Sequence, residues 1–361
     1  MQIEEPAVEA AAAGSGFTGV VAIDAGDERV FERCYGFAHR GLAVPNTTGT
    51  RFGLASGSKT FTALAVLRLV ETGRLRLTDP VRPILGDDLP LIDDAVTIEQ
   101  LLTHTSGIGD YLDEEADWKP DDYVLTVPVH QLAETSGFLP MLERRPQKFP
   151  PGERFGYCNQ GFMVLALVIE RVAGAGFHEF VEAEVFARAA LTHTGFLRSD
   201  DLPGDAALGY FEKVGNRTNV LHLPVRGNGD GGAYTTVSDL HLFWRALLAG
   251  RIVGPELVAE LTRPRNDVPE EGMRYAAGLW LHATGPALIM AGYDAGVAAR
   301  SVHDPESATT ATVLSNSSRG AGAVIDVVQG FFDGLPGIPG RPVRMPKAPG
   351  DPLQTPLGRV P

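Results

Sequence analysis

The sequence predicts an α+β fold in which one antiparallel sheet is assembled from both ends of the chain and flanked by helices. Three observations carry this prediction. Two short strand patterns flank a turn near the N-terminus, helical patterns fill most of the middle, and several strand-like runs follow residue 272. The middle of the chain is then an inserted, mainly helical lobe.

The N-terminal part predicts a hairpin followed by a buried helix. FTGVVAI and RVFERCY are rich in β-branched and aromatic residues and flank the turn AGDE. Between Ser56 and Thr72 the apolar residues form a helical stripe, and Gly73 is placed as its C-cap.

The rest of the chain predicts helical pieces, then a meander. The helical pieces are VTIEQLLTH, residues 161–173, HEFVEAEVFARA and VSDLHLFWRALLAG. The strand-like runs are YAAGLWLHA, ALIMAG, VAARSVH and ATTATVLS, and residues 320–332 supply a closing helix.

This organisation predicts a single catalytic unit over residues 1–334. Its α/β lobe comprises residues 16–54 and 272–334, and its mainly helical lobe comprises residues 55–271. Residues 335–361 carry eight prolines and little periodicity, which predicts an extended or disordered tail.

The amino-acid composition limits the classes of partner that the protein is expected to bind. The 361 residues include 31 Lys and Arg against 45 Asp and Glu, a formal charge of −14 that disfavours nucleic acid and anionic membrane surfaces. The two cysteines, Cys34 and Cys158, are too few for a disulfide framework and are expected to be free thiols in a reducing compartment. An acidic N-terminus without basic residues predicts a cytoplasmic start, and no apolar run approaches the ~20 residues of a membrane span. The oligomeric state is left open.

Ser56 and Lys59 form an S-x-x-K motif at the start of the predicted helix, which places them one turn apart on one face. A desolvated lysine with a lowered pKa can take the proton of a serine hydroxyl and make it a nucleophile. The alternative is a helix-capping serine beside a solvated lysine.

Tyr157 and Asn159 lie two apart just ahead of a predicted helix, where a phenol and an amide can face one cleft. A tyrosine beside a lysine ammonium can be held partly as phenolate and act as a base. The alternative is a packing tyrosine and a capping asparagine. His104, between two threonines, is interpreted as a structural histidine.

Other site types are not indicated. GSGFTG precedes a strand where a dinucleotide site needs a helix, and neither G-x-S-x-G nor H-E-x-x-H occurs. No metal or organic cofactor is predicted.

Four segments give the chain a resemblance to the serine β-lactamase and D-Ala-D-Ala peptidase superfamily, in its class C-like branch that includes carboxylester hydrolases. The segments are RFGLASGSKTFTALAVLRLVETGRLRLTDPV, LLTHTSGI, PGERFGYCNQGFMVLALVIERVAG and GDGGAYTTVSDLHLFWRALLAG. The resemblance implies a β-lactamase-like fold with an active-site cleft between the lobes. It also implies that Ser56 is acylated, Lys59 is its proton partner, Tyr157 is the general base and Asn159 is an orienting amide.

One motif departs from this family. Where the family carries Lys- or His-x-Gly on a strand that lines the cleft, this sequence has Met290, Ala291 and Gly292. The resemblance implies an oxyanion hole made by the backbone N–H groups of Ser56 and Tyr293, which does not depend on the missing cation. Met290 is expected to line the cleft and to favour an uncharged substrate over one that carries a carboxylate.

The predicted function is acyl-serine chemistry on a small neutral ester or amide. Two alternatives remain: an acyltransferase that uses the same acyl-serine, and a degenerate, non-catalytic binding protein of this fold. The predicted partner is a small-molecule substrate.

Overall fold

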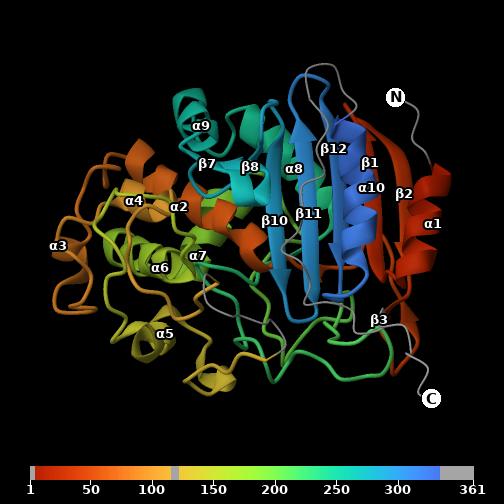
Figure 1. The fold of residues 1–361 in the computed structure, drawn as a ribbon, viewed down its shortest axis with the longest axis horizontal. Helices are drawn as coiled ribbons and strands as arrows, with labels where there is room; N and C mark the ends of the chain where they lie inside the picture. The colour runs from red at the N-terminus through yellow and green to blue at the C-terminus, as the bar shows by residue number, and fades with distance from the viewer. Residues whose placement is uncertain (1–4, 115–121, 334–361) are drawn as a thin grey trace, which may run out of the picture.

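A computed structural model describes residues 5–114 and 122–333, and an eight-stranded antiparallel sheet dominates one side of the molecule (Figure 1). The strand order is β2-β1-β12-β11-β10-β9-β8-β7. The strands are β1 (Gly19–Ala25), β2 (Glu28–Tyr35), β7 (Asn266–Val268), β8 (Met273–Tyr275), β9 (Trp280–His282), β10 (Leu288–Asp294), β11 (Val297–Asp304) and β12 (Thr309–Ser315). Because β1 pairs with β12 along its whole length, both ends of the chain build one sheet, as predicted.

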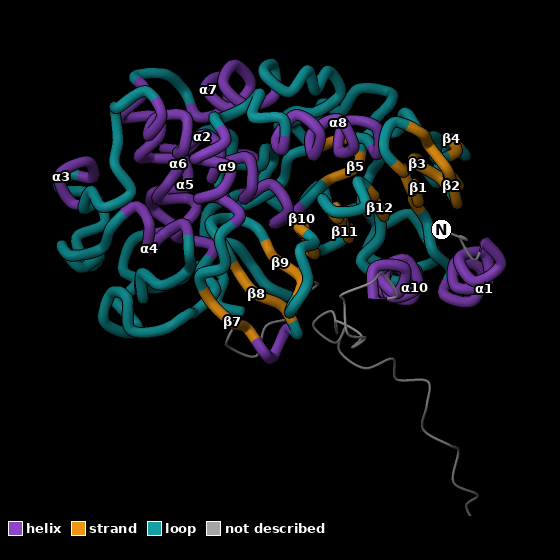
Figure 2. The backbone as a smooth tube through the Cα atoms, turned by 90° about the horizontal axis from the view of Figure 1, so that it is seen from above, coloured by secondary structure: helices purple, strands orange, loops and turns teal. Residues whose placement is uncertain are grey.

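Helices cover both faces of this sheet. α1 (Glu5–Ser15) and α10 (Ala321–Asp333) lie side by side on one face, and α8 (Val237–Leu248) covers the other (Figure 2). The pleat divides the strand residues accordingly: Val21 and Ile23 pack in the core under α1 and α10, whereas Val20 and Ala22 pack in the core that continues into the helical lobe.

The helical lobe is built around α2 (Lys59–Glu71) and α6 (Asn159–Ala173), which pack against each other. Every residue of α6 from Asn159 to Ile169 is buried, so this helix forms the centre of the lobe. Around it lie α3 (Arg82–Leu85), α4 (Ile98–Leu102), α5 (Thr135–Leu142), α7 (Phe177–Val181) and α9 (Pro255–Thr262), with short helical turns η1 (Ala55–Ser58), η2 (Val129–Gln131), η3 (Glu182–Phe186) and η4 (Pro269–Glu271).

Two minor sheets complete the described chain. β3 (Phe37–His39) pairs with β4 (Val44–Pro45), and β5 (Phe52–Gly53) pairs with β6 (Tyr234–Thr235). The second pair joins the segment before Ser56 to the glycine-rich loop that ends at Gly232, which brings two of the predicted motifs together.

The sheet lobe is larger than the sequence predicted. α1 precedes residue 16 and packs on α10, β7 joins the sheet before residue 272, and α8 covers a sheet face from within the segment assigned to the helical lobe. Burial of apolar side chains such as Val8 on α1 explains these additions. The proline-rich tail predicted from residue 335 lies outside the described residues.

The described helices are short relative to the thickness of a bilayer. Within residues 5–114 and 122–333, no single helix is long and apolar enough to span a bilayer, and α6 with residues 177–186 meets that test only as a pair bent by 81°.

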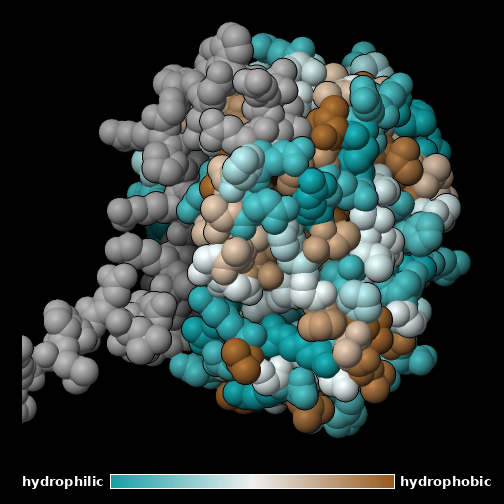
Figure 3. All heavy atoms as spheres, turned by 90° about the vertical axis from the view of Figure 1, so that its right-hand side faces the viewer, coloured by the Kyte–Doolittle hydropathy of each residue, from teal (hydrophilic) through white to brown (hydrophobic). Residues whose placement is uncertain are grey.

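Cys34 and Cys158 are both free thiols, as predicted. The face over α1 and β2 carries hydrophobic side chains scattered among hydrophilic ones (Figure 3).

Candidate active site

Ser56 lies in the tight turn η1, which runs directly into α2. The preceding residue, Ala55, adopts a left-handed backbone with φ of 44°, a conformation that is unfavourable for a residue with a Cβ. Hydrogen bonds hold it there, because the Ala55 carbonyl accepts from Ser58 Oγ at 2.8 Å and from the Gly232 N–H at 3.2 Å. Backbone strain of this kind is concentrated at functional sites.

Lys59 is the first residue of α2, and only 1% of its surface is exposed. Its Nζ donates to Ser56 Oγ at 2.9 Å, to Asn159 Oδ1 at 2.7 Å and to the Asp230 carbonyl at 2.6 Å. Burial lowers the pKa of Lys59, while the negative charges of Asp230 and Glu114 act in the opposite direction. The predicted serine–lysine contact is therefore present in a buried setting, with two further acceptors that fix the amine.

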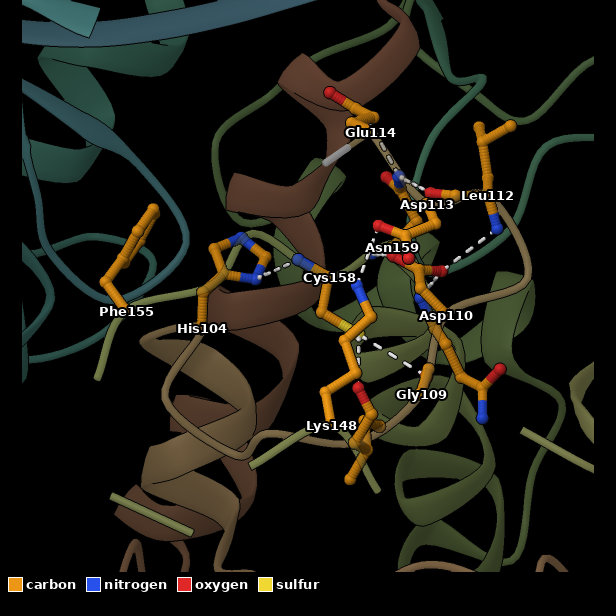
Figure 4. A network of polar contacts seen from close by, with 12 residues as sticks. His104, Gly109, Asp110, Leu112, Asp113, Glu114, Lys148, Phe155, Cys158 and Asn159 are labelled. Carbon is orange, nitrogen blue, oxygen red and sulfur yellow. Dashed lines mark hydrogen bonds and ion pairs between the residues drawn. The ribbon is translucent and has the colours of Figure 1, made fainter. Parts of the chain in front are cut away.

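Asn159 begins α6 and orients the amine. Its Oδ1 accepts from Lys59. Its Nδ2 donates to Glu114 Oε1 at 2.9 Å (Figure 4) and to the Leu112 carbonyl at 3.3 Å, so both ends of the amide have partners. The Asp110 carboxylate accepts the N–H groups of Asn159 at 2.6 Å and Gln160 at 3.0 Å. Burial nevertheless raises the pKa of Asp110 to about 7.

Tyr157 packs among aromatic rings next to this pair. Its ring stacks on Trp280 at 6.1 Å between centroids and lies 5.1 Å from Lys59 Nζ. Burial raises the pKa of Tyr157 well above its usual range, the charge of Glu114 raises it further, and a hydrogen bond with Ser56 acts in the opposite direction. Burial and, to a lesser extent, the nearby carboxylates therefore favour a protonated phenol over the partial phenolate that the sequence analysis expects.

His104 packs against Tyr157, and its described hydrogen bond is with the backbone of Cys158. Its ring lies 4.3 Å from the Tyr157 ring, and its Nδ1 accepts the Cys158 N–H at 3.1 Å. The proton of the neutral ring is therefore on Nε2. Burial lowers the pKa of His104 well below its usual range, so a neutral, structural histidine agrees with the interpretation from sequence.

Gly292 allows β10 to approach η1. A Cβ at this position would lie 1.9 Å from the Leu54 carbonyl oxygen and 2.9 Å from the Gly57 nitrogen, so a larger residue cannot occupy it without displacing the turn. This close approach places Tyr293, the next residue on β10, in the lining of the cavity that contains Ser56.

Met290 is not where the sequence predicted. It is 2% exposed and packs in the hydrophobic core shared with α2 and α6, and it is absent from the lining of the cavity at Ser56. Its thioether therefore belongs to the core, where the apolar surface of α2 and α6 surrounds it.

The cavity itself lies between the helical lobe and the end of β10 and encloses about 930 Å³, its open mouth included. Three acidic residues that the sequence analysis did not single out line it: Glu114, Asp230 and Asp294. Each lies close in sequence to a predicted motif: Glu114 follows LLTHTSGI, Asp230 lies in GDGGAYTT, and Asp294 follows Tyr293. Their positions next to these motifs are the sequence signal that could have identified them as residues of the site.

The fold and this site define a class of protein in which a serine–lysine pair lies at the seam between an antiparallel sheet and a helical lobe. The family model described as beta-lactamase matches residues 5–327, and the chain belongs to that family.

Individual relatives differ in their described roles. A penicillin-binding protein of Bacillus subtilis (strain 168) is 31% identical over 246 residues, which cover 64% of this chain and 52% of that protein. Esterase EstB of Burkholderia gladioli is 34% identical over 178 residues, which cover 48% of this chain and 45% of that protein. The chain thus spans about half the length of these curated relatives. The crystal structure of a penicillin-binding protein from Bacillus halodurans aligns with a TM-score of 0.84 and 38% identity, covering 90% of this chain and all of that one.

Proposed function

We propose that this protein hydrolyses small esters or amides through an acyl intermediate on Ser56. The observation that carries the proposal is the three-way hydrogen bonding of Lys59 Nζ. A neutral amine has two N–H bonds and one lone pair. If Asn159 Oδ1 and the Asp230 carbonyl take the two N–H bonds, the lone pair faces Ser56 Oγ. Lys59 is therefore oriented as the base that activates the serine.

The remaining proton transfers follow from the neutral state of Tyr157. As Ser56 Oγ bonds to the substrate carbonyl carbon, its proton passes to Lys59, and the backbone N–H groups of Ser56 and Tyr293 stabilise the oxyanion. Tyr157 donates its phenol proton to the leaving group as the carbon–heteroatom bond breaks. Lys59 then returns a proton to Tyr157, and water releases the acyl group by the same transfers in reverse.

A substrate with a carboxylate is disfavoured in this cavity, although the reason differs from the one expected. Met290 is buried in the core, but none of the described residues that line the cavity is lysine, arginine or histidine, and three are acidic. We therefore expect weak turnover of penicillins and of peptides that end in a free carboxylate.

The test is covalent labelling with a fluorophosphonate, followed by peptide mass spectrometry and a panel of small esters. The adduct is expected on Ser56, with loss of labelling and turnover in Ser56→Ala. Ser199→Ala is the matched control, because Ser199 also lines the cavity but has no described partner for its Oγ. Labelling that survives Ser56→Ala would contradict the proposal. Preferential transfer of the acyl group to an added alcohol over water would favour the acyltransferase alternative.

A further inference from the structure

The cavity at Ser56 has an unusual charge for a site that handles acyl groups. Glu114, Asp230 and Asp294 all line it, and the nearest described cation is Lys59, beneath Ser56. None of the three carboxylates forms an ion pair with an arginine or histidine among the described residues. Among the described residues, Lys59 is therefore the cation whose charge acts on Glu114 and Asp230.

Each carboxylate that lines the cavity is positioned by one side-chain donor. Glu114 Oε1 accepts from Asn159, Asp230 Oδ2 accepts from the Tyr111 hydroxyl, and Asp294 Oδ1 accepts from the Tyr123 hydroxyl at 3.1 Å. Among the described residues, the second oxygen of each accepts no hydrogen bond from a side chain, and the Asp230 carboxylate also has a backbone hydrogen bond. These contacts fix three carboxylates in the lining of the cavity.

Gathering these groups is electrostatically unfavourable in the empty cavity. Burial raises the pKa of all three carboxyls, that of Asp294 to about 7, and the charge of Asp230 raises the pKa of both Glu114 and Asp294. The other titratable groups that interact with them include Lys59, Asp110, Asp113, Tyr111, Tyr123 and Tyr157. A bound cation would relieve this repulsion.

The shape of the site favours an organic cation over a metal ion. Within the described chain, no group of three His, Cys, Asp or Glu side chains is close enough to hold a metal. The rings of Tyr111, Tyr123 and Tyr234 also line the cavity, together with apolar side chains such as Leu125 and Phe138. Aromatic faces attract ammonium groups, and apolar walls accept a carbon skeleton.

We propose that the substrate of this acyl-serine site carries an ammonium group on an apolar skeleton, bound by the cavity carboxylates of Asp294, Asp230 and Glu114. This inference rests on the proposed hydrolysis at Ser56 and specifies its substrate class. It also replaces the sequence-based expectation of an uncharged substrate.

The first test compares matched esters that differ only in charge. Phenylalanine methyl ester is compared with methyl 3-phenylpropanoate, and butyrylcholine with 3,3-dimethylbutyl butyrate, in which carbon replaces the charged nitrogen. We expect kcat/KM to favour the cationic member of at least one pair by about tenfold or more. Equal or better turnover of the neutral member in both pairs would overturn the inference.

The second test removes one negative charge at a time. Asp294→Asn retains an oxygen that can accept from Tyr123 and from the Ala295 N–H. It is expected to lower kcat/KM for the preferred cationic ester about tenfold, mainly through KM, and to change turnover of its neutral partner less than twofold. Asp87→Asn, at an exposed position after α3, removes the same charge far from the cavity and should change neither. Equal effects of Asp294→Asn on both esters would contradict charge recognition.

A third measurement separates this inference from the proposed function. Calorimetry on Ser56→Ala measures binding of phenylalanine methyl ester and of methyl 3-phenylpropanoate without acylation. Tighter binding of the cationic ester would support the inference about the substrate. It would do so even if Ser56 were not labelled, a result that would overturn only the hydrolase proposal. Equal binding of the two esters overturns the inference even if Ser56 is labelled.

Discussion

Burial shifts the pKa values of Lys59 and Tyr157 in opposite directions, and this difference supports the separate roles proposed for them. Burial lowers the pKa of Lys59 and raises that of Tyr157. The first change makes a neutral amine available as a base, and the second keeps the phenol protonated as an acid. The sequence analysis expects both residues to share proton transfer; burial is the main cause of the two opposite pKa shifts that favour Lys59 as the base.

This division of labour predicts a dependence on the leaving group. Tyr157→Phe should slow hydrolysis of an alkyl ester about 100-fold or more, because the alkoxide needs a proton, and should slow a p-nitrophenyl ester much less. Lys59→Ala should slow both esters similarly, because Ser56 needs its base in either case. The measurement is kcat for both esters with each variant, and equal losses in Tyr157→Phe would argue against the phenol as the acid.

The burial of Met290 predicts a loss of stability instead of a change in specificity. Met290→Lys would bury an ammonium in the core and should lower the free energy of unfolding by several kcal/mol, about 3 or more. Met290→Leu, which nearly conserves volume, should cost less than about 1.5 kcal/mol. Urea denaturation of both variants checks this. A stable Met290→Lys variant with new activity on carboxylate-bearing esters would restore the cleft-lining interpretation.

At the scale of elements, the site depends on the contact between β10 and η1. β10 is held in the sheet by seven register pairs with β11, from Leu288 with His303 to Asp294 with Val297. η1 is fixed by hydrogen bonds from Gly232 and Ser58 to Ala55. Because both partners are anchored elsewhere, neither can shift to accommodate a bulkier interface.

Two glycines on either side of this contact give a matched pair. Gly292→Ala places a Cβ against the Leu54 carbonyl and should abolish activity and lower the melting temperature by several degrees. Gly57→Ala meets only Leu54 and Ala291 atoms at 3.7 Å or more, and its fold should be retained. Thermal unfolding and ester hydrolysis measure both effects. Full activity in Gly292→Ala would show that β10 does not shape the site.

At the scale of the whole molecule, the acidic cavity lowers the free energy of unfolding by an amount that depends on pH. Burial raises the pKa of Asp294 from its ordinary value of 3.8 to about 7, so the folded chain binds a proton between these values that the unfolded chain does not. The contribution of the Asp294 carboxyl to the free energy of unfolding is therefore favourable at low pH and is lost as the pH rises through about 7.

Asp294→Asn should therefore stabilise the protein, more at pH 8 than at pH 5. At pH 8 the natural carboxyl is ionised in the folded state against its environment, whereas the amide carries no charge. Calorimetric melting temperatures of the natural protein and the variant at both pH values provide the test. A variant that melts below the natural protein at pH 8 would show that the carboxylate is stabilised by its surroundings.

Sequence alone predicted much of this architecture because its signals are local. Strand alternation gave the N-terminal hairpin and the C-terminal meander, helical periodicity gave α2 and α6, and the S-x-x-K spacing placed Ser56 and Lys59 one turn apart. Two parts of the prediction failed for want of tertiary information. α1 was missed although its alanines favour helix, and Met290 was placed in the cleft.

The sequence by itself determined the elements, the motifs and the pairing of serine with lysine, because each depends on residues within a few turns of one another. Only the tertiary structure decided the chemistry of the cavity. It brings Glu114, Asp230 and Asp294 from three distant segments to one wall and directs Met290 into the core. Charge interactions in a buried site depend on distance in space and on solvation, and a sequence records neither.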